Sequence, residues 1–502
     1  MIVQSLKDIS LTSDLNFDVV VVGSGPGGSL SGLKAAQQGK KVAILEMGRP
    51  LQTKDFVLDE ATAYKNLYQE AAGRTSLDGA ITILQGRALG GGSTINWTSS
   101  FRTPELTLKY WQKYFGLKDL SMEKLLPFFK EAESLIGVKD GEITPNRNND
   151  LLAEGLSKIG AKHGLIKRNV RGCQNLGYCG LGCPVGAKQS ALVTSLPMAN
   201  KLGAEIFCDA VAERFIWKNS RVEALEVSVR GLQNQKYIFK AKTFICAAGA
   251  IGSPALLLRS KVADPYETLG KRTFIHPTTI SGAIFKEKVE AYYGAPQTVY
   301  SDHFLPTKLE EEAAGFKLEV PPIHPLLLAT SLPIFGKDHY ELMKNLPYIQ
   351  ATIALQRDGF HPESQGGRVI LKNGRPFLDY KFTPYMEKAF RQSLLVMGEA
   401  QLAAGAYEVM PIHRQGLRVK SLGALLKHVN ELSMKALELK VVSAHVMGGC
   451  AMGARPQESV TDPSGRFHHL ENLVIRDGSL FPTGIGTNPM LSIMGLVGQL
   501  SS

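Results

Sequence analysis

The stretch from Phe17 to Glu46 constrains the fold of this chain more than any other segment. It begins with an apolar run rich in β-branched residues, Phe17 to Val22, which is typical of a strand buried on both faces of a parallel sheet. A glycine-rich turn follows, then an amphipathic helix to about Gln38, and then a second apolar strand from Lys41 to Leu45. The segment therefore predicts a complete β-α-β unit.

The turn of this unit has the spacing G-x-G-x-x-G, with glycines at Gly23, Gly25 and Gly28. The first glycine permits the tight turn, the second lets the backbone approach a pyrophosphate, and the third allows the helix to pack closely on the strand. The N-terminus of the helix offers free N–H groups and the positive end of its dipole to phosphates. Glu46 ends the second strand, where a carboxylate can accept hydrogen bonds from ribose hydroxyls. These features predict a dinucleotide-binding site but do not say which dinucleotide it holds.

Length and composition limit the classes of protein that remain. A chain of 502 residues exceeds the usual size of one hydrophobic core, so we expect two domains. The net charge of +11 comes without a block of lysine and arginine, so nucleic acid is not an expected partner. No transmembrane run and no signal peptide are recognisable, which predicts a cytoplasmic protein. A peripheral association with an anionic membrane or with a redox partner stays open.

Two later segments also have sequence patterns typical of a nucleotide-binding domain. The loop at 83–104 contains Gly90 to Gly92 followed by Ser93 and Asn96, which suits close approach of the backbone to a flat or charged ligand. Residues 243–260 form a second strand–turn–helix pattern, but without a second G-x-G-x-x-G. A second bound nucleotide such as nicotinamide is therefore not expected.

Three cysteines, Cys173, Cys179 and Cys183, lie close together in the sequence with the spacing C-x5-C-x3-C. This spacing offers three thiolates and no fourth ligand nearby, whereas a structural zinc site takes four, and it fits no iron–sulfur pattern. We therefore predict no metal site. Free thiols and one local disulfide both remain open.

Four stretches in order along the chain resemble the glucose–methanol–choline (GMC) family of flavin-dependent oxidoreductases. They are the fingerprint at 23–28, GRALGGGSTIN at 86–96, GAIGSPALLLRS at 249–260, and the C-terminal pair AHVMGGCAMG at 444–453 with TNPMLSIMG at 487–495. The resemblance implies an α/β fold with a discontinuous, Rossmann-like FAD-binding domain and a second domain built on a mostly antiparallel sheet. The implied ranges are 1–104, 171–260 and 436–502 for the FAD-binding domain, and 105–170 and 261–435 for the lid and substrate-binding domain.

The resemblance also implies which residues hold FAD. The implied set is Gly23, Gly25, Gly28 and Glu46 for the ADP half, Gly90, Gly91, Ser93 and Asn96 for the pyrophosphate and isoalloxazine, Ala212 for a backbone contact to adenine, Asp477 and Gly478 for the phosphates and ribityl chain, and Pro489 and Met490 beside the catalytic asparagine. Some members attach FAD covalently through a histidine just before the asparagine. Ile95 takes that place here, so we expect non-covalent FAD.

His445 and Asn488 match the catalytic pair of the family. An alcohol gives up its hydride only as its O–H proton leaves, so a base must lie within hydrogen-bonding distance of the oxygen. His445, with an ordinary pKa near 6.5, is predicted to be that base near neutral pH. Asn488 is predicted to orient the oxygen and to stabilise its developing negative charge.

Within the family, the cysteine loop with its Lys188-Gln189-Ser190 resembles long-chain (fatty) alcohol oxidases, and the KQS segment also resembles cholesterol oxidases. We therefore predict a lipophilic primary or secondary alcohol as substrate, and dioxygen or another acceptor for the electrons. Glu319 matches an acidic position of the fatty alcohol oxidase pattern and is predicted to be a carboxylate on the substrate side, the alternative being a solvated loop charge. His276, His324 and His413 are expected to be structural.

Two rival functions share this fold: a lyase or light-driven decarboxylase, and the catalytic subunit of a sugar or polyol dehydrogenase. Two positions depart from the family pattern, because Lys261 stands where a glycine is usual and Ser100 where an aromatic residue is common. The last helix of the family normally runs further than Ser502 allows, so a longer C-terminus is expected.

Overall fold

The predicted β-α-β unit is present in the computed structural model as β2 (Asn16–Val22), α1 (Pro26–Gln37) and β3 (Val42–Leu45). Pro26 stands at the start of α1, where a missing N–H costs nothing, and Gly39 follows its end with φ +73°. Both strands are buried, as expected for the centre of a parallel sheet. The structure describes residues 1–10, 13–140, 143–309 and 313–502.

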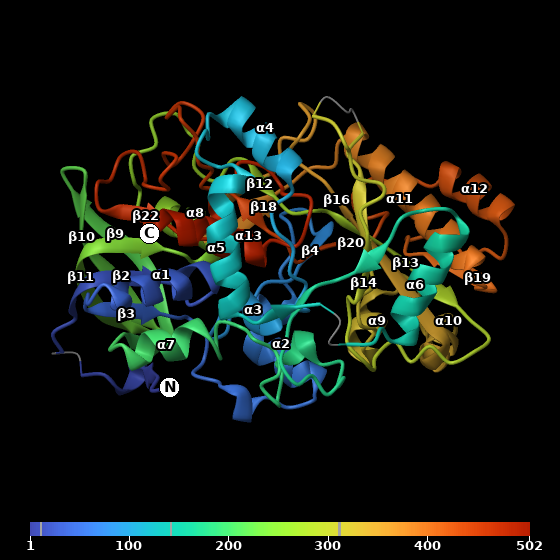
Figure 1. Ribbon diagram of the computed structural model, residues 1–502, viewed down its shortest axis with the longest axis horizontal. Helices are drawn as coiled ribbons and strands as arrows, with labels where there is room; N and C mark the ends of the chain where they lie inside the picture. The colour runs from blue at the N-terminus through green and yellow to red at the C-terminus, as the bar shows by residue number, and fades with distance from the viewer. Residues whose placement is uncertain (11–12, 141–142, 310–312) are drawn as a thin grey trace.

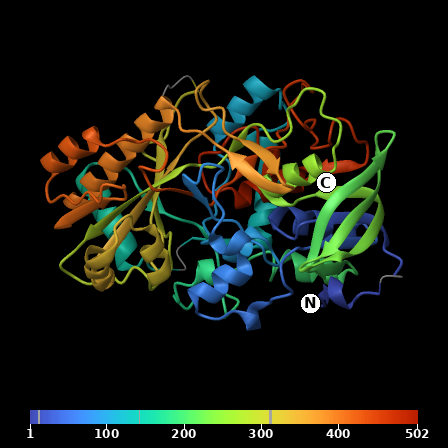
Figure 2. The same ribbon diagram turned by 180° about the vertical axis from the view of Figure 1, so that it is seen from behind.

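The first sheet grows on both sides of this unit, on the left in Figure 1. Its pairs from β1 across to β11 are parallel, β22 adds a further parallel strand beside β11, and β9, β10 and β11 continue as an antiparallel meander at the other end (Figure 2, green). The strands within residues 204–229 are thus part of this sheet. Its other strands are β1 (Gln4–Ser5), β8 (Glu205–Cys208), β9 (Ala210–Lys218), β10 (Arg221–Val229), β11 (Leu232–Cys246) and β22 (Leu473–Ile475).

Helices from distant parts of the chain cover the first sheet. The helix α1 packs against α7 (Ser195–Lys201) and α13 (Met490–Leu500), and α5 (Met122–Leu135) packs on α13. The core of this half also contains Trp111 of α4 (Glu105–Phe115). The range 105–170 was predicted to form a lid and part of the substrate domain. In the structure α5 packs on α13, and Trp111 of α4 stacks on Phe481 within the core of the nucleotide half.

The second sheet lies on the right in Figure 1 and is mostly antiparallel, as predicted. Its central pair joins β13 and β16 over their full lengths, and β15 adds to β16 on the outer side. Its strands are β4 (Ile81–Ile83), β6 (Gly164–Leu165), β13 (Thr278–Ile284), β14 (Val299–Ser301), β15 (Phe316–Glu319), β16 (Ile349–Gln356), β19 (Glu408–Pro411) and β20 (Val441–Ser443).

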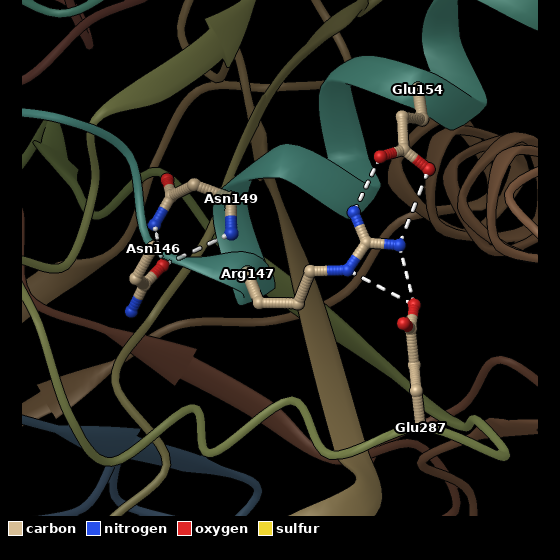
Figure 3. Close-up of polar contacts among 5 residues, drawn as sticks. All are labelled: Asn146, Arg147, Asn149, Glu154 and Glu287. Atoms are coloured by element: carbon tan, nitrogen blue, oxygen red, sulfur yellow. Dashed lines mark hydrogen bonds and ion pairs between the residues drawn. The ribbon is translucent and has the colours of Figure 1, made fainter.

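The long helix α11 (Pro384–Ala403) covers one face of this sheet, and α12 (Leu422–Glu431) and α6 (Arg147–Lys158) pack on it. The start of α6 is fixed by Asn146, whose side-chain oxygen accepts the N–H of Asn149 at 3.1 Å (Figure 3). Arg147 then lies between Glu154 on the same helix and Glu287 after β13, with its Nε 3.0 Å from Glu287 (Figure 3). These part-exposed ion pairs tie α6 to the second sheet and contribute at most about 1 kcal/mol each.

The chain passes between the two sheets several times. The strands β4 and β20 pair in parallel in the second sheet, although residues 81–83 and 441–443 lie in ranges predicted for the FAD-binding domain. The predicted discontinuity itself is seen, because β22 and α13, from the end of the chain, pack beside β11 and α1. The predicted domain boundaries otherwise stay a prediction.

Shorter elements complete the described parts of the chain. They are β5 (Val138–Lys139) with β7 (Arg168–Asn169), β12 (Thr273–Phe274) with β21 (Met447–Gly448), β17 (Arg368–Lys372) with β18 (Arg375–Asp379), and the helices α2 (Glu60–Leu67), α3 (Gly92–Ile95), α8 (Gly249–Arg259), α9 (Pro325–Ser331) and α10 (Gly336–Lys344). None of the described helices combines the length and the apolar character needed to cross a membrane.

Candidate active site

A cavity of about 580 Å³ is lined by residues from both sheets and extends from the glycine-rich turn after β2 to the apolar face of β13 and β16. Among the residues predicted from the sequence, those that line it are Gly23, Gly25, Glu46, Gly91, Ser93, Asn96, Ala212, His445, Asp477, Gly478, Asn488, Pro489 and Met490. Gly28, Gly90 and Glu319 lie behind its wall rather than on it. The structure thus gathers most of the predicted site from segments far apart in the sequence.

The fingerprint glycines serve different purposes. A Cβ at Gly28 would lie 1.9 Å from the carbonyl oxygen of Gly23, and a Cβ at Gly23, where φ is +102°, would lie 2.2 Å from the carbonyl oxygen of Ala247. Packing within the protein therefore requires both. A Cβ at Gly25 would meet nothing closer than the Cα of Gly91 at 3.9 Å. Glycine at this position leaves open space beside the turn, which fits the approach of a phosphate group.

The loop before α3 closes over the same turn. Gly91 has φ +57°, and a Cβ there would lie 2.6 Å from the Cα of Gly25. The Ser93 hydroxyl donates to the carbonyl of Gly90 at 2.6 Å, so it braces the loop from within. The amide of Asn96 donates to the sulfur of Met490, while its Oδ1 is buried with no partner among the described residues. An unpaired buried acceptor at a cavity wall is a position where a bound ligand donates a hydrogen bond.

Two buried carboxylates form hydrogen bonds that fix the backbone around the nucleotide end of the cavity. Glu46 accepts hydrogen bonds from the Ser24 hydroxyl at 2.5 Å and from the Gly48 N–H at 2.8 Å. Asp477 accepts from the N–H of Gly249 at 2.8 Å and from the Ser253 hydroxyl at 2.6 Å, which fixes the start of α8. Burial raises the pKa of both carboxyl groups. Each carboxylate oxygen keeps lone pairs, so the predicted contact of Glu46 with ribose stays compatible with these bonds.

At the other end of the cavity His445 follows β20 and Asn488 precedes α13. The Nδ1 of His445 lies 3.4 Å from the Nδ1 of His276, with the two rings nearly perpendicular at 84°. Burial beneath the surface lowers the pKa of His445 to about 4, so the ring is neutral at pH 7. A neutral imidazole at this position can either donate or accept one proton, depending on its tautomer.

Asn488 forms a hydrogen bond with Glu319, for which the sequence predicted either a place on the substrate side or a solvated loop charge. The side chain of Glu319 on β15 is fully buried, and its Oε2 accepts from Asn488 Nδ2 at 3.1 Å and from Gln297 Nε2 at 2.6 Å. Its Oε1 has no partner among the described residues. The loop-charge alternative is therefore wrong, whereas a substrate role stays a prediction. Burial raises the pKa of Glu319 to about 7, and the charge of Lys317 opposes that rise.

Lys317 and Gln297 are parts of this cluster that sequence reasoning missed. Lys317 stands two residues before Glu319 on β15, so both side chains lie on one face of the strand. Its buried ammonium lies 3.8 Å and 3.9 Å from the ring centres of Phe101 and Tyr300, and burial lowers its pKa to about 8. The signal that could have revealed Lys317 was the sequence K-x-E within a buried strand, because this spacing places two charged side chains on the same face.

The cysteine loop lies against the wall of the cavity. Cys173, Cys179 and Cys183 are free thiols, and no cluster of metal-ligating side chains occurs among the described residues. Lys188 is buried and donates to the carbonyls of Cys179 and Asn96, at 2.5 Å and 3.1 Å. The loop thereby supports the backbone of the segment that ends in Asn96.

A Rossmann-like sheet, a second antiparallel sheet and one cavity shared by both define the class of two-domain flavoproteins. Family models described as GMC oxidoreductase match residues 64–278 and 362–496, and a model for an FAD-binding domain matches residues 18–55. The chain belongs to the GMC oxidoreductase family and is an FAD-dependent oxidoreductase.

Individual relatives agree with this assignment. A long-chain-alcohol oxidase of Arabidopsis thaliana, FAO4B, is 29% identical over 512 residues, which cover 97% of this chain and 67% of the plant protein. The chain thus spans about two thirds of the length of that relative. The crystal structure of pyridoxine 4-oxidase from Mesorbium loti aligns with a TM-score of 0.67 at 17% identity, covering 96% of this chain and 98% of that chain. A formate oxidase of Aspergillus oryzae aligns with a TM-score of 0.72 at 14% identity, covering 98% of both chains. At these identities the two solved structures show the fold alone.

Proposed function

We propose that this protein oxidises a lipophilic alcohol to the carbonyl compound, with FAD as the hydride acceptor. The observation that carries the proposal is the difference in polarity between the two ends of one cavity. The end near His445 and Asn488 is polar, and the walls beyond it are apolar, with Ile280, Ile353, Leu355, Met410, Leu327 and Leu328 among the lining residues. A hydrocarbon chain would be buried there while its hydroxyl reaches the polar end.

The residues at the nucleotide end fit FAD. The space beside Gly25, the close approach of Gly91 and the unpaired Oδ1 of Asn96 form a cradle for the cofactor, which supplies the hydride-accepting ring when bound. Ile95 lines the cavity and has no nucleophilic atom, which supports non-covalent attachment. The predicted roles of Ala212 and Asp477 toward FAD are part of this proposal.

The protein's own part in the reaction is to bind the hydroxyl and to manage its proton. His445 and Asn488 line the cavity and both offer hydrogen-bonding atoms to a substrate oxygen. Glu319, bonded to Asn488, adds a titratable group one layer behind them. The similarity to FAO4B supports an alcohol as substrate and dioxygen as acceptor. The cytoplasmic location, and a membrane or redox partner, stay predictions from the sequence.

Anaerobic mixing of the purified flavoprotein with a panel of alcohols tests the proposal. The panel contains primary alcohols of increasing chain length, a sterol, a sugar and a polyol, and the readout is loss of the oxidised flavin absorbance. We expect faster bleaching and lower half-saturating concentrations as the chain lengthens. Bleaching by the sugar alone would favour a polyol dehydrogenase. The absence of bleaching by every alcohol would refute the proposal and favour a lyase or decarboxylase.

A further inference from the structure

One face of the second sheet forms a continuous apolar wall of the cavity, which we call the cavity floor. In β16 every second residue lines the cavity, and these residues are Ile349, Ala351, Ile353 and Leu355. In the neighbouring strand β13 the lining residues are again every second one, Thr278, Ile280 and Gly282. A single sheet face therefore forms this wall, and its only polar side chain is that of Thr278 among the residues of β13 and β16 that line the cavity.

The opposite face of the same two strands is polar and is hydrogen-bonded to α11. The hydroxyl oxygens of Thr279 and of Ser393 on α11 are 2.8 Å apart. Ser281 donates to Gln401 of the same helix at 2.7 Å, and Gln401 donates to Gln350 of β16 at 2.7 Å. The apolar face of a sheet is normally buried against another layer of secondary structure. Here that face is left to the cavity, and buried hydrogen bonds fix the floor from behind.

The register of the sheet places the floor residues in rows at increasing distance from the polar end of the cavity. The partner of Thr278 on β20 stands three residues before His445, so this row lies nearest to the polar end. Gly282 lies four residues further along β13, where it pairs with Ala351 on one side and with Met410 of β19 on the other. A strand rises about 3.3 Å per residue, so the two rows are about 13 Å apart, roughly the length of a straight chain of ten carbon atoms.

The row of Gly282 has the smallest side chains of the floor. Glycine inside a strand weakens the strand and often marks a position that a ligand approaches closely. The φ of Gly282 lies outside the left-handed range and its pairings continue without a bulge, so the backbone itself does not require glycine. A Cβ there would lie 3.2 Å from the Cε of Met410, the end of a flexible side chain, and 3.8 Å from the next nearest atom. This row, with Ala351 beside Gly282, thus leaves more room for a ligand than the preceding row, which pairs Ile280 with Ile353.

We propose that the row of Gly282 and Ala351, bordered by Met410, is the subsite for the distal part of a straight hydrocarbon chain and sets the chain length that the enzyme prefers. The inference rests on the proposed alcohol oxidation and adds the length of the substrate. A chain of about ten carbon atoms whose hydroxyl lies at the polar end reaches this row, whereas a shorter chain leaves it empty. Each methylene that enters the row removes apolar surface from water, so affinity rises with chain length until the row is filled.

Substitutions that fill the row should shorten the preferred chain. Gly282→Val adds a side chain suited to a strand, and Ala351→Val fills the same row from the neighbouring strand. With straight primary alcohols from butanol to hexadecanol, we expect kcat/KM for decanol and longer alcohols to fall about 10- to 100-fold in each variant, while that for butanol stays within about threefold. Gly282→Ala takes the place of Gly282→Val if the latter does not fold.

Met410→Ala should act in the opposite direction, because it widens the same row. We expect the optimum of kcat/KM to move toward longer or terminally branched alcohols. An unchanged chain-length profile in both valine variants would overturn the proposal. An equal loss of kcat/KM for butanol and hexadecanol would also overturn it, because the damage would then not be confined to the distal part of the chain.

Thr352→Val is the matched control. Thr352 follows Ala351 on β16 and lies on the face turned away from the cavity, where its hydroxyl accepts from the side chain of Gln350 at 2.9 Å. The substitution keeps the size of the side chain and removes one hydrogen bond of the polar layer. It should leave the chain-length profile unchanged. A profile shortened as much as in Ala351→Val would show general loosening of the sheet and overturn the role of the row.

Binding without oxidation separates this inference from the proposed function. Straight-chain alkyl methyl ethers of graded length have the same chain and no hydroxyl to oxidise. At a fixed ether concentration, the rise in Tm of the FAD-loaded protein should increase with length up to about the decyl ether, and should level off at a shorter length in Gly282→Val. If no alcohol reduces the flavin but the ethers behave in this way, the proposed oxidation fails and the chain subsite stands. If the rise in Tm does not depend on ether length, or depends on it equally in the valine variants, the subsite fails whatever the alcohols do.

Discussion

The buried carboxyl group of Glu319 should make the stability of this protein depend on pH in a way that one substitution removes. Burial raises the pKa of Glu319 from 4.5 to about 7. The native state therefore binds this proton more tightly than the unfolded chain does. The stabilisation is complete below pH 4.5 and is lost as the pH rises through 7. The rise in pKa corresponds to about 3 kcal/mol of unfolding free energy.

Glu319→Gln keeps the shape of the side chain and removes the titration. We expect the difference in unfolding free energy between the variant and the unsubstituted protein to change by about 3 kcal/mol between pH 4 and pH 8, in favour of the variant at the higher pH. The entropy of unfolding of a 502-residue chain is about 1 kcal/mol per degree, so this corresponds to about 3 °C in Tm.

Thermal unfolding of both proteins, loaded with FAD and followed by flavin fluorescence from pH 4 to pH 9, measures this change. Glu123→Gln, which removes an exposed carboxylate from α5, is the control for the loss of one negative charge. The reasoning is refuted if the Tm curves of Glu319→Gln and the unsubstituted protein run parallel across this range. It is also refuted if the variant gains stability at low pH instead.

Two further substitutions test the two ends of the cavity. Gly91→Ala should lower the ratio of bound flavin to protein, because the new Cβ would lie 2.6 Å from the Cα of Gly25. Its control is Gly79→Ala, which has a similar φ of +78° but no neighbour within 4 Å and should keep the normal flavin ratio. Leu328→Arg, in the apolar wall, should raise KM for long-chain alcohols about tenfold or more, whereas KM for short alcohols should change little. Its control is Leu326→Arg, at an exposed position of the same helix. Normal flavin content in Gly91→Ala, or equal KM values in the two leucine variants, would contradict these assignments.

The parts of the fold that could be predicted are those with short-range causes. The fingerprint turn, α1 and β3 follow from apolar periodicity and glycine placement within a single segment. The predicted antiparallel second sheet and the return of the C-terminus to the first sheet are confirmed by β13–β16 and by β22 beside β11. The pairing of β4 with β20 was not predicted, because a three-residue strand carries too little pattern to choose a partner across hundreds of residues.

The residues of the site also divide into those that local motifs predict and those that depend on long-range contacts. His445, Asn488 and the glycines were identified through motifs, and the structure places His445 and Asn488 on one cavity. The position of the His276 ring beside His445 could not be predicted from the segment FIHPTT. It depends on hydrogen bonds from the N–H groups of Ile485 and Gly486, which come from the other end of the chain. The apolar faces of α4 and α5 were visible in the sequence, but amphipathicity says which face is buried and not which neighbour buries it.

The repeated passage of the chain between the two sheets has a mechanical consequence. A pair of domains joined by one linker can open about a hinge, but here the connections before and after β4, α6, β13 and β20 all tether one half to the other. Bending all of these tethers together would break the packing on both sides of the cavity. Exchange of substrate and product should therefore depend on a local displacement, and the short helix α9, whose Leu327 and Leu328 form part of the cavity wall while Leu326 faces outward, is the segment placed to provide it.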